Sequence, residues 1–304
     1  MPHPPARDIL ALLAMAVLFG LTFIASKAAL AGLDIFQLVF ARYILAFLVL
    51  AWVFRRRLPD LRIARRDWGH FLILTAVEPI GYFTFETWAV YYTTPASVSL
   101  LIATVPAFAL LFGWGILAER PGWREVLGIL ICFLGVYLIV GRQEASGLAP
   151  DPLLGNVLAL ATAMSAGLYN VLARRLSFSY SPLVITFYQA LAATVVFAPL
   201  ATWEYAADPG ALDLTLPVVG SVLYLSFGAS LAGYYLLNRS LSRFGAAQVA
   251  VWGNLIPVVT IAASFMVYGE VLGWGRMAGA VLVVAGISVT FVRARARAAA
   301  APVP

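Results

Sequence analysis

Two glutamates and a tyrosine follow one another at four-residue spacing inside a long apolar stretch of the sequence. Glu78, Tyr82 and Glu86 therefore share one stripe of any helix that runs through this stretch. A carboxylate in such an environment is costly, so it is protonated, paired, or facing water in a cavity. We expect this pair of acids to exchange protons or to bind a cationic group. The alternative is a plain ion pair of Glu78 or Glu86 with Arg42 or Lys27.

Aromatic and amide side chains in other apolar stretches offer the contacts that a small solute needs. The face of an aromatic ring attracts an ammonium group, and a neutral amide forms hydrogen bonds without the cost of a buried charge. For each aromatic residue, packing or anchoring at a membrane interface is the alternative. Together with the acidic stripe, we predict solute contacts from Tyr169, Tyr234, Trp252 and Asn254.

Five further residues have types that are unusual in apolar segments or at their ends. Pro106 and Pro257 each remove a backbone hydrogen bond within a predicted helix, which predicts a bend and a free carbonyl facing a cavity. Arg42 is a cation inside an apolar segment, so we expect a structural partnership with a carbonyl or an acid. Glu119 and Glu270 lie at helix ends beside water. We expect each to be a structural cap or interhelical contact, with a gating role as the alternative.

Enzyme and metal chemistry find no support in the sequence. Both histidines, His3 and His70, lie outside the predicted membrane core, and no metalloprotease, hydrolase or P-loop motif occurs. Cys132 is the one cysteine, which excludes an intramolecular disulfide and a cysteine zinc cluster. We therefore expect no enzymatic activity, no cofactor and no metal site.

Composition places these residues in a membrane protein. The chain has 304 residues, of which 62% are hydrophobic and 11% charged, and its mean hydropathy is +0.92. Soluble domains are about 45–50% apolar and about 25% charged, so a soluble globule of this composition would expose mostly hydrocarbon. The net charge of +6 comes from short arginine runs between apolar stretches, which argues against a nucleic acid partner. The lipid bilayer is the expected partner.

The apolar stretches are long enough to cross that bilayer. A membrane-spanning helix needs about 20 apolar residues, and turn residues divide the chain into ten such segments with no soluble domain between them. The predicted spans run approximately over residues 9–31, 35–54, 69–91, 96–118, 124–141, 152–173, 181–203, 214–237, 245–268 and 274–292.

Cations between the segments predict the orientation, because cytoplasmic loops carry an excess of lysine and arginine. With the N-terminus inside, 16 of the 20 cations lie at cytoplasmic ends and three lie outside, namely Lys27, Arg142 and Arg276. We therefore expect a multi-pass protein of the plasma membrane, in a bacterial inner membrane, with both termini in the cytoplasm.

The two halves of the chain match each other. A shift of 151 residues aligns 96–142 with 247–293 without a gap, and nine of the 47 pairs are identical. Further pairs upstream are Lys27/Arg174, Arg42/Gln189 and Gly81-Tyr82/Gly233-Tyr234. Five helices per repeat invert the second copy in the membrane. We expect a first repeat at residues 1–142, an external linker at 143–151, a second repeat at 152–293 and a cytoplasmic tail at 294–304.

The duplicated pattern resembles the drug/metabolite transporter superfamily, specifically its ten-helix exporters with two EamA domains. The motif is a proline in the fourth helix of the repeat, a glutamate ending that helix, and then Gly-Trp and two glycines seven residues apart in the fifth. It occurs here as Pro106, Glu119, Gly122-Trp123, Gly128 and Gly135, and again as Pro257, Glu270, Gly273-Trp274, Gly279 and Gly286. The segments Lys27 to Leu30 and Phe40-Ala41-Arg42-Tyr43 also resemble the family's first two helices.

The resemblance implies an all-α membrane protein with ten transmembrane helices in two inverted five-helix repeats. It further implies a secondary transporter that exports a small amphiphilic metabolite, such as an amino acid, an amine or a derivative, by alternating access. The cavity of such members is lined by the third, fourth, eighth and ninth helices, with contributions from the first and sixth. Typical members have neutral residues where this chain carries Glu78 and Glu86, and these two acids are the candidates for proton coupling.

Two alternatives to this function remain open at the sequence level. One is an uncoupled facilitator or exchanger of the same class of solute, and the other is a membrane-embedded protein that does not transport. A monomer is compatible with the sequence, which leaves the oligomeric state open.

Overall fold

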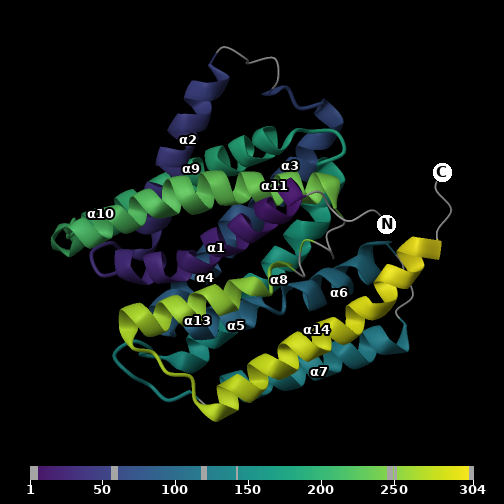
Figure 1. The fold of residues 1–304 in the computed structure, drawn as a ribbon. Helices are drawn as coiled ribbons and strands as arrows, with labels where there is room; N and C mark the ends of the chain where they lie inside the picture. The colour runs from purple at the N-terminus through teal and green to yellow at the C-terminus, as the bar shows by residue number, and fades with distance from the viewer. Residues whose placement is uncertain are drawn as a thin grey trace.

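The computed structural model describes residues 6–55, 61–117, 122–141, 143–244, 249 and 252–300. Within these ranges the chain is helical and has no β-strand beyond one isolated bridge between Ser146 and Ala149. The helices of the first half are α1 (Ala6–Ala29), α2 (Ile35–Phe54), η2 (Arg65–Asp67), α3 (Trp68–Thr75), η3 (Ala76–Gly81), α4 (Tyr82–Tyr92), α5 (Pro95–Ile102), α6 (Val105–Leu117) and α7 (Trp123–Val140) (Figure 1). Those of the second half are α8 (Pro152–Leu176), α9 (Pro182–Ala207), η4 (Pro209–Ala211), α10 (Leu216–Leu223), η5 (Tyr224–Gly233), α11 (Tyr234–Arg243), α13 (Leu255–Tyr268) and α14 (Trp274–Ala300).

These helices follow the ten predicted spans and form an all-α membrane protein with two inverted five-helix repeats. Seven stretches among the described residues are long and apolar enough to cross a membrane, and α13 and the apolar part of α14 are shorter apolar helices. The third, fourth and eighth spans are each built from two or three helical pieces in line. The start of α1 and the end of α14 lie on the same side of the bundle, at the right of Figure 1.

Three spans begin with the same local device. Asp151, Ser181 and Thr94 each accept a hydrogen bond at the side chain from the backbone N–H three residues later, at 3.1, 3.4 and 3.2 Å. A proline follows each of them as the first helical residue. The cap satisfies a free N–H, and proline lacks the N–H that would otherwise be unpaired there. These residues therefore determine where α8, α9 and α5 start.

The third and eighth spans both pass through a π-helical section in mid-membrane. The section η3 ends at Gly81 and η5 ends at Gly233, and α4 and α11 begin at the tyrosine that follows each glycine. These Gly-Tyr pairs are the ones that the two halves share in sequence. Within η3, Glu78 leaves helical geometry at φ −150° and ψ 116°. A π-helical turn changes the direction of the side chains that follow it. The side chains of both spans therefore change direction at corresponding positions of the two repeats.

The fourth and ninth spans are interrupted just before their prolines. A turn at Ala103–Thr104 separates α5 from α6, and Pro106 is the second residue of α6. In the second half, a turn at Gly253–Asn254 precedes α13, of which Pro257 is the third residue. Proline is tolerated in the first turn of a helix because the N–H of that turn has no helical acceptor. Turns therefore interrupt the fourth and ninth spans at corresponding positions of the two halves.

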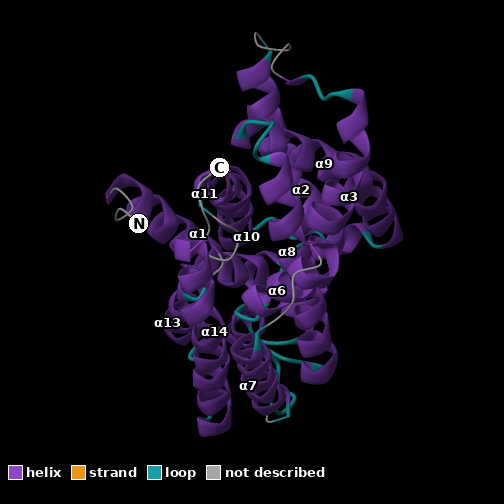
Figure 2. Cartoon of the chain, turned by 90° about the vertical axis from the view of Figure 1, so that its right-hand side faces the viewer, coloured by secondary structure: helices purple, strands orange, loops and turns teal. Residues whose placement is uncertain are grey.

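The fifth and tenth spans, α7 and α14, lie side by side at one edge of the bundle in both views (Figures 1 and 2). Their motif glycines face each other. A Cβ atom added at Gly135 would lie 2.6 Å from the Gly279 carbonyl oxygen, and one at Gly286 would lie 2.5 Å from that of Gly128. Only glycine allows the two backbones to approach this closely.

Candidate functional site

A cavity lies where the interrupted and π-helical spans of the two halves meet. Its walls come from the first, third, fourth, sixth, eighth and ninth spans, as the family resemblance implies, and Arg42 of the second span also reaches it. The walls are largely apolar, with six aromatic rings and a few polar groups. Residues lining the cavity include Phe19, Phe23, Arg42, Glu78, Tyr82, Phe83, Pro106, Tyr169, Asn170, Tyr234 and Asn254.

Most of the residues selected from the sequence lie around this cavity. Five of the seven predicted solute contacts line it: Glu78, Tyr82, Tyr169, Tyr234 and Asn254. Buried Oδ1 of Asn254 has no hydrogen-bond partner among the described residues, so an acceptor is available there.

The remaining selected residues lie elsewhere. Glu86 is fully buried behind the cavity wall, and Trp252 packs on the neighbouring apolar cluster around Leu12 and Met15. Pro106 lines the cavity, whereas Pro257 is buried one turn beyond Asn254. Glu119 lies outside the described residues.

The Glu78 carboxylate joins the two halves of the protein. It lies at the break in η3 and is 2% exposed. Its Oε1 accepts a hydrogen bond from the hydroxyl of Tyr234, at the start of α11. Its Oε2 is buried and has no hydrogen-bond partner among the residues described. One oxygen of this acid is therefore held by the opposite repeat, and the other is available for a proton or a ligand.

Arg42 is paired with the second acid of the stripe. Its Nη1 lies 3.9 Å from Oε2 of Glu86, and both side chains are 1% exposed or less. Its Nε donates to the Ser230 hydroxyl of η5 at 2.9 Å. The guanidinium also lies over the Phe83 ring, with its carbon 4.3 Å from the ring centroid. The structure thus divides the acidic stripe, since Glu86 faces Arg42 and Glu78 faces the cavity.

The second half carries a neutral network at the corresponding place. The hydroxyl of Tyr169 donates to Oδ1 of Asn238 at 2.5 Å. The Asn238 amide donates to Oε1 of Gln189 at 3.2 Å and to the Thr186 hydroxyl at 3.1 Å. All four side chains are buried. This network holds Tyr169, and with it one wall of the cavity, in a fixed position.

Sequence reasoning did not select Ser230, Gln189 or Thr186 for this site. The alignment of Arg42 with Gln189 was the available signal, because it places a polar residue at the same level in both repeats. Ser230 carried no such signal, since a serine within an apolar helix is common and its hydroxyl can bond to its own backbone.

Comparison with known proteins identifies the family. The sequence model of the EamA-like transporter family matches this chain twice, over residues 7–141 and 153–292. The chain belongs to the EamA-like transporter family. It is thus a multi-pass membrane transporter of the drug/metabolite transporter superfamily.

Individual relatives of this EamA-like transporter agree with the assignment. The chain is 26% identical to the uncharacterized transporter YcxC of Bacillus subtilis, over 94% of this chain and 93% of that protein. It is 27% identical to a protein of Salmonella typhimurium named probable amino-acid metabolite efflux pump, over 96% and 97% of the two chains. One solved structure superposes with a TM-score of 0.67 at 20% identity, covering 96% of this chain and 99% of that one, which is a likeness of fold.

Proposed function

We propose that this transporter exports a small amphiphilic metabolite, of the amino acid or amine class, by alternating access coupled to protons. The observation that carries the proposal is the Glu78 carboxylate, which lines the cavity between the repeats. One of its oxygens is bonded to Tyr234, and the other has no hydrogen-bond partner in the part of the chain that the structure describes. A membrane-embedded acid facing a cavity is typical of proton relays and cation sites.

The rings around Glu78 favour an amphiphilic solute. Phe19, Tyr82, Tyr169 and Tyr234 present apolar faces and ring edges to the same space. Such rings contact the apolar part of a solute and attract its ammonium group. The Salmonella typhimurium relative, named a probable amino-acid metabolite efflux pump, supports the same class of solute and the outward direction.

Competition at one carboxylate gives a simple coupling scheme. Ionised Glu78 binds a cationic group of the solute, and protonated Glu78 does not. A proton that enters from outside therefore displaces the solute into the external medium. The protonated, solute-free site then carries the proton inward when the transporter changes conformation. An uncoupled facilitator of the same solute would share the cavity but would not need this titration.

Binding and flux measurements test the proposal. Purified protein is screened by thermal shift against amino acids, amines and nucleosides, because a ligand that binds the folded state raises its apparent stability. Any hit is then assayed in proteoliposomes with and without a pH gradient. Gradient-driven accumulation of an amine or amino acid supports coupled export, whereas equilibration that is indifferent to the gradient identifies a facilitator.

The orientation is tested separately. We propose that both termini lie in the cytoplasm of a bacterial cell, with repeats at residues 1–142 and 152–293. Single cysteines at the exposed positions Arg62 and Gly147 report the side of each loop through an impermeant thiol reagent. Labelling of Gly147→Cys alone in intact cells is expected, and external labelling of Arg62→Cys would overturn the orientation.

A further inference from the structure

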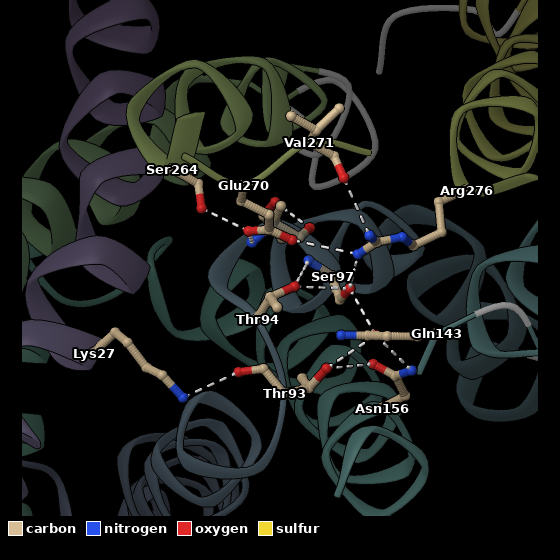
Figure 3. A network of polar contacts seen from close by, with 12 residues as sticks. Lys27, Thr93, Thr94, Ser97, Gln143, Asn156, Ser264, Glu270, Val271 and Arg276 are labelled. Atoms are coloured by element: carbon tan, nitrogen blue, oxygen red, sulfur yellow. Dashed lines mark hydrogen bonds and ion pairs between the residues drawn. The ribbon is translucent and has the colours of Figure 1, made fainter. Parts of the chain in front are cut away.

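A second polar cluster lies at the end of the bundle where α13 meets α14, away from the cavity (Figure 3). Glu270, in the connection between these helices, accepts a hydrogen bond from the Ser264 hydroxyl at 2.6 Å and from the backbone N–H of Ala96 at 3.4 Å. Arg276 pairs with Glu270 at 3.3 Å and donates to the Ser97 hydroxyl at 3.4 Å. The second repeat thereby holds the first turn of α5, which belongs to the first repeat.

The cluster continues across the bundle from Ser97. The hydroxyl of Ser97 donates to Oε1 of Gln143 at 2.9 Å. The same oxygen accepts from the Asn156 amide of α8 at 3.2 Å and from the Thr93 hydroxyl at 3.1 Å. Lys27 of α1 reaches the same region and donates to the backbone carbonyls of Val90 at 2.7 Å and of Thr93 at 3.4 Å, the second of which joins it to the cluster. Figure 3 shows these side chains as one chain of contacts between both repeats.

This cluster lies between the cavity and the end of the bundle that carries the 143–151 segment. On α1, Phe23 lines the cavity and Lys27 lies one turn further along. On α5, Ile102 lines the cavity and Ser97 lies more than one turn nearer the start of the helix. Val98 and Leu101, between these levels, are fully buried. Fully buried apolar side chains therefore lie between the cavity and this end of the bundle in this conformation.

We infer that Glu270 and Arg276, with Ser97 and the Ala96 N–H, form an external latch that keeps the outer end of the cavity shut. The inference rests on the proposed alternating access and on the proposed orientation. Alternating access requires that contacts between the repeats at one end break and re-form. The contacts from Glu270 and Arg276 to α5 are long for charge-assisted hydrogen bonds, and such contacts are strong enough to bias a conformation and weak enough to open.

Cysteine accessibility tests the latch without any need for a substrate. Ile102→Cys places a thiol on the cavity wall, and an impermeant maleimide is added to intact cells. The parent chain, whose Cys132 is buried, serves as the blank. Adding Glu270→Gln or Arg276→Gln removes about one charge-assisted contact, so the labelling rate is expected to rise on the order of tenfold. Ser97→Ala, a milder change, is expected to raise the rate less.

Glu204 provides a matched control at the same end of the molecule. Its carboxylate caps the start of α2 by accepting from the backbone N–H groups of Phe36 and Gln37 at 2.8 and 2.9 Å, away from α5 and α14. Glu204→Gln is expected to leave the labelling of Ile102→Cys unchanged. Unchanged labelling in Glu270→Gln and Arg276→Gln would overturn the latch, and so would equal acceleration by Glu204→Gln.

Flux assays on the same variants separate this inference from the proposed function. Labelling requires neither a solute nor a proton gradient, so it reports on the latch even where flux is absent. Faster labelling in the latch variants of a chain that shows no flux supports the latch and contradicts the transport proposal. Unchanged labelling in the latch variants of a chain that shows coupled flux contradicts the latch and supports the transport proposal.

Discussion

In the first half Arg42 and Glu86 face each other at 3.9 Å between α2 and α4, whereas in the second half Gln189 and Asn238 face each other at 3.2 Å between α9 and α11. Arg42 aligns with Gln189 in the repeat. Glu86 lies four residues after Tyr82, as Asn238 lies four residues after the matching Tyr234. The same contact is thus built twice, once from charges and once from amides.

The acid of the cavity shows the same asymmetry. Glu78 lies four residues before Tyr82, and Ser230 lies four residues before Tyr234. Glu78 accepts from Tyr234 of the second half, and Ser230 accepts from Arg42 of the first. The amide pair of the second half shows that this contact between two spans can be built without charges. A buried ion pair adds little net stability relative to a neutral replacement, so we propose that the charges of the first half serve transport.

The largest expected effect comes from breaking the charged pair on one side only. Arg42→Gln leaves Glu86 buried without its cation, which costs about 3–5 kcal/mol of stability. The double variant Arg42→Gln/Glu86→Asn copies the second half and is expected to recover most of that loss. Thermal unfolding of the purified variants measures both. A single variant as stable as the wild type, or a double variant no better than the single, would show that the two contacts are not equivalent.

The next prediction concerns Glu78, whose counterpart in the second half is the neutral Ser230. Glu78→Gln keeps the shape of the side chain but cannot ionise, so we expect gradient-driven flux to be abolished. Because the variant is neutral like the protonated acid, the competition scheme also predicts weaker binding of a cationic solute. Glu86→Gln is expected to act in the same direction if that acid also exchanges protons. If Glu78 instead exchanges protons without contacting the solute, solute exchange persists in Glu78→Gln. Measuring binding and flux on the same variants distinguishes the two roles, and Tyr234→Phe, which keeps the acid, should retain gradient-driven flux.

A smaller effect is expected from the two prolines, which occupy like positions in both halves. Replacing Pro106 and Pro257 together by alanine restores a backbone donor near each interruption and favours a continuous helix. We expect reduced flux in a protein that still inserts and folds. Undiminished flux in the double variant would show that the turns at 103–104 and 253–254 are maintained by the neighbouring helices and not by proline.

The smallest effect concerns Lys27 and Arg174, two cations that align with each other in the repeats. Lys27 donates to the carbonyls of Val90 and Tyr91 at the end of α4, and Arg174 donates to that of Leu241, near the end of α11. Each cation satisfies a helix C-terminus, a contribution of about 1 kcal/mol. Lys27→Gln and Arg174→Gln should therefore lower stability by similar small amounts in thermal unfolding. A large loss in only one of them would show that the repeats depend on this contact unequally.

The sequence by itself determined the class of the protein, its ten spans, its duplication and its family. These properties follow from information along the chain. A lipid environment demands apolar runs of a set length, and turn residues, caps and prolines separate the runs. The repeated Pro, Glu, Gly-Trp and Gly pattern can be recognised from residue types and spacing alone, without a structure. Residue type also singled out Glu78 and the aromatic residues, because a polar side chain in an apolar segment is conspicuous.

Only the tertiary structure decided which of those side chains line the cavity and which pack behind its wall. Glu78 and Glu86 share a helical stripe in the sequence, yet one faces Tyr234 and the cavity while the other faces Arg42. The direction of each depends on the π-helical section and the break between them, and on helices that lie far away in the chain. Helix periodicity predicts which residues share a face. It does not predict where that face points, because the rotation of a helix in the membrane is set by its packing against its neighbours.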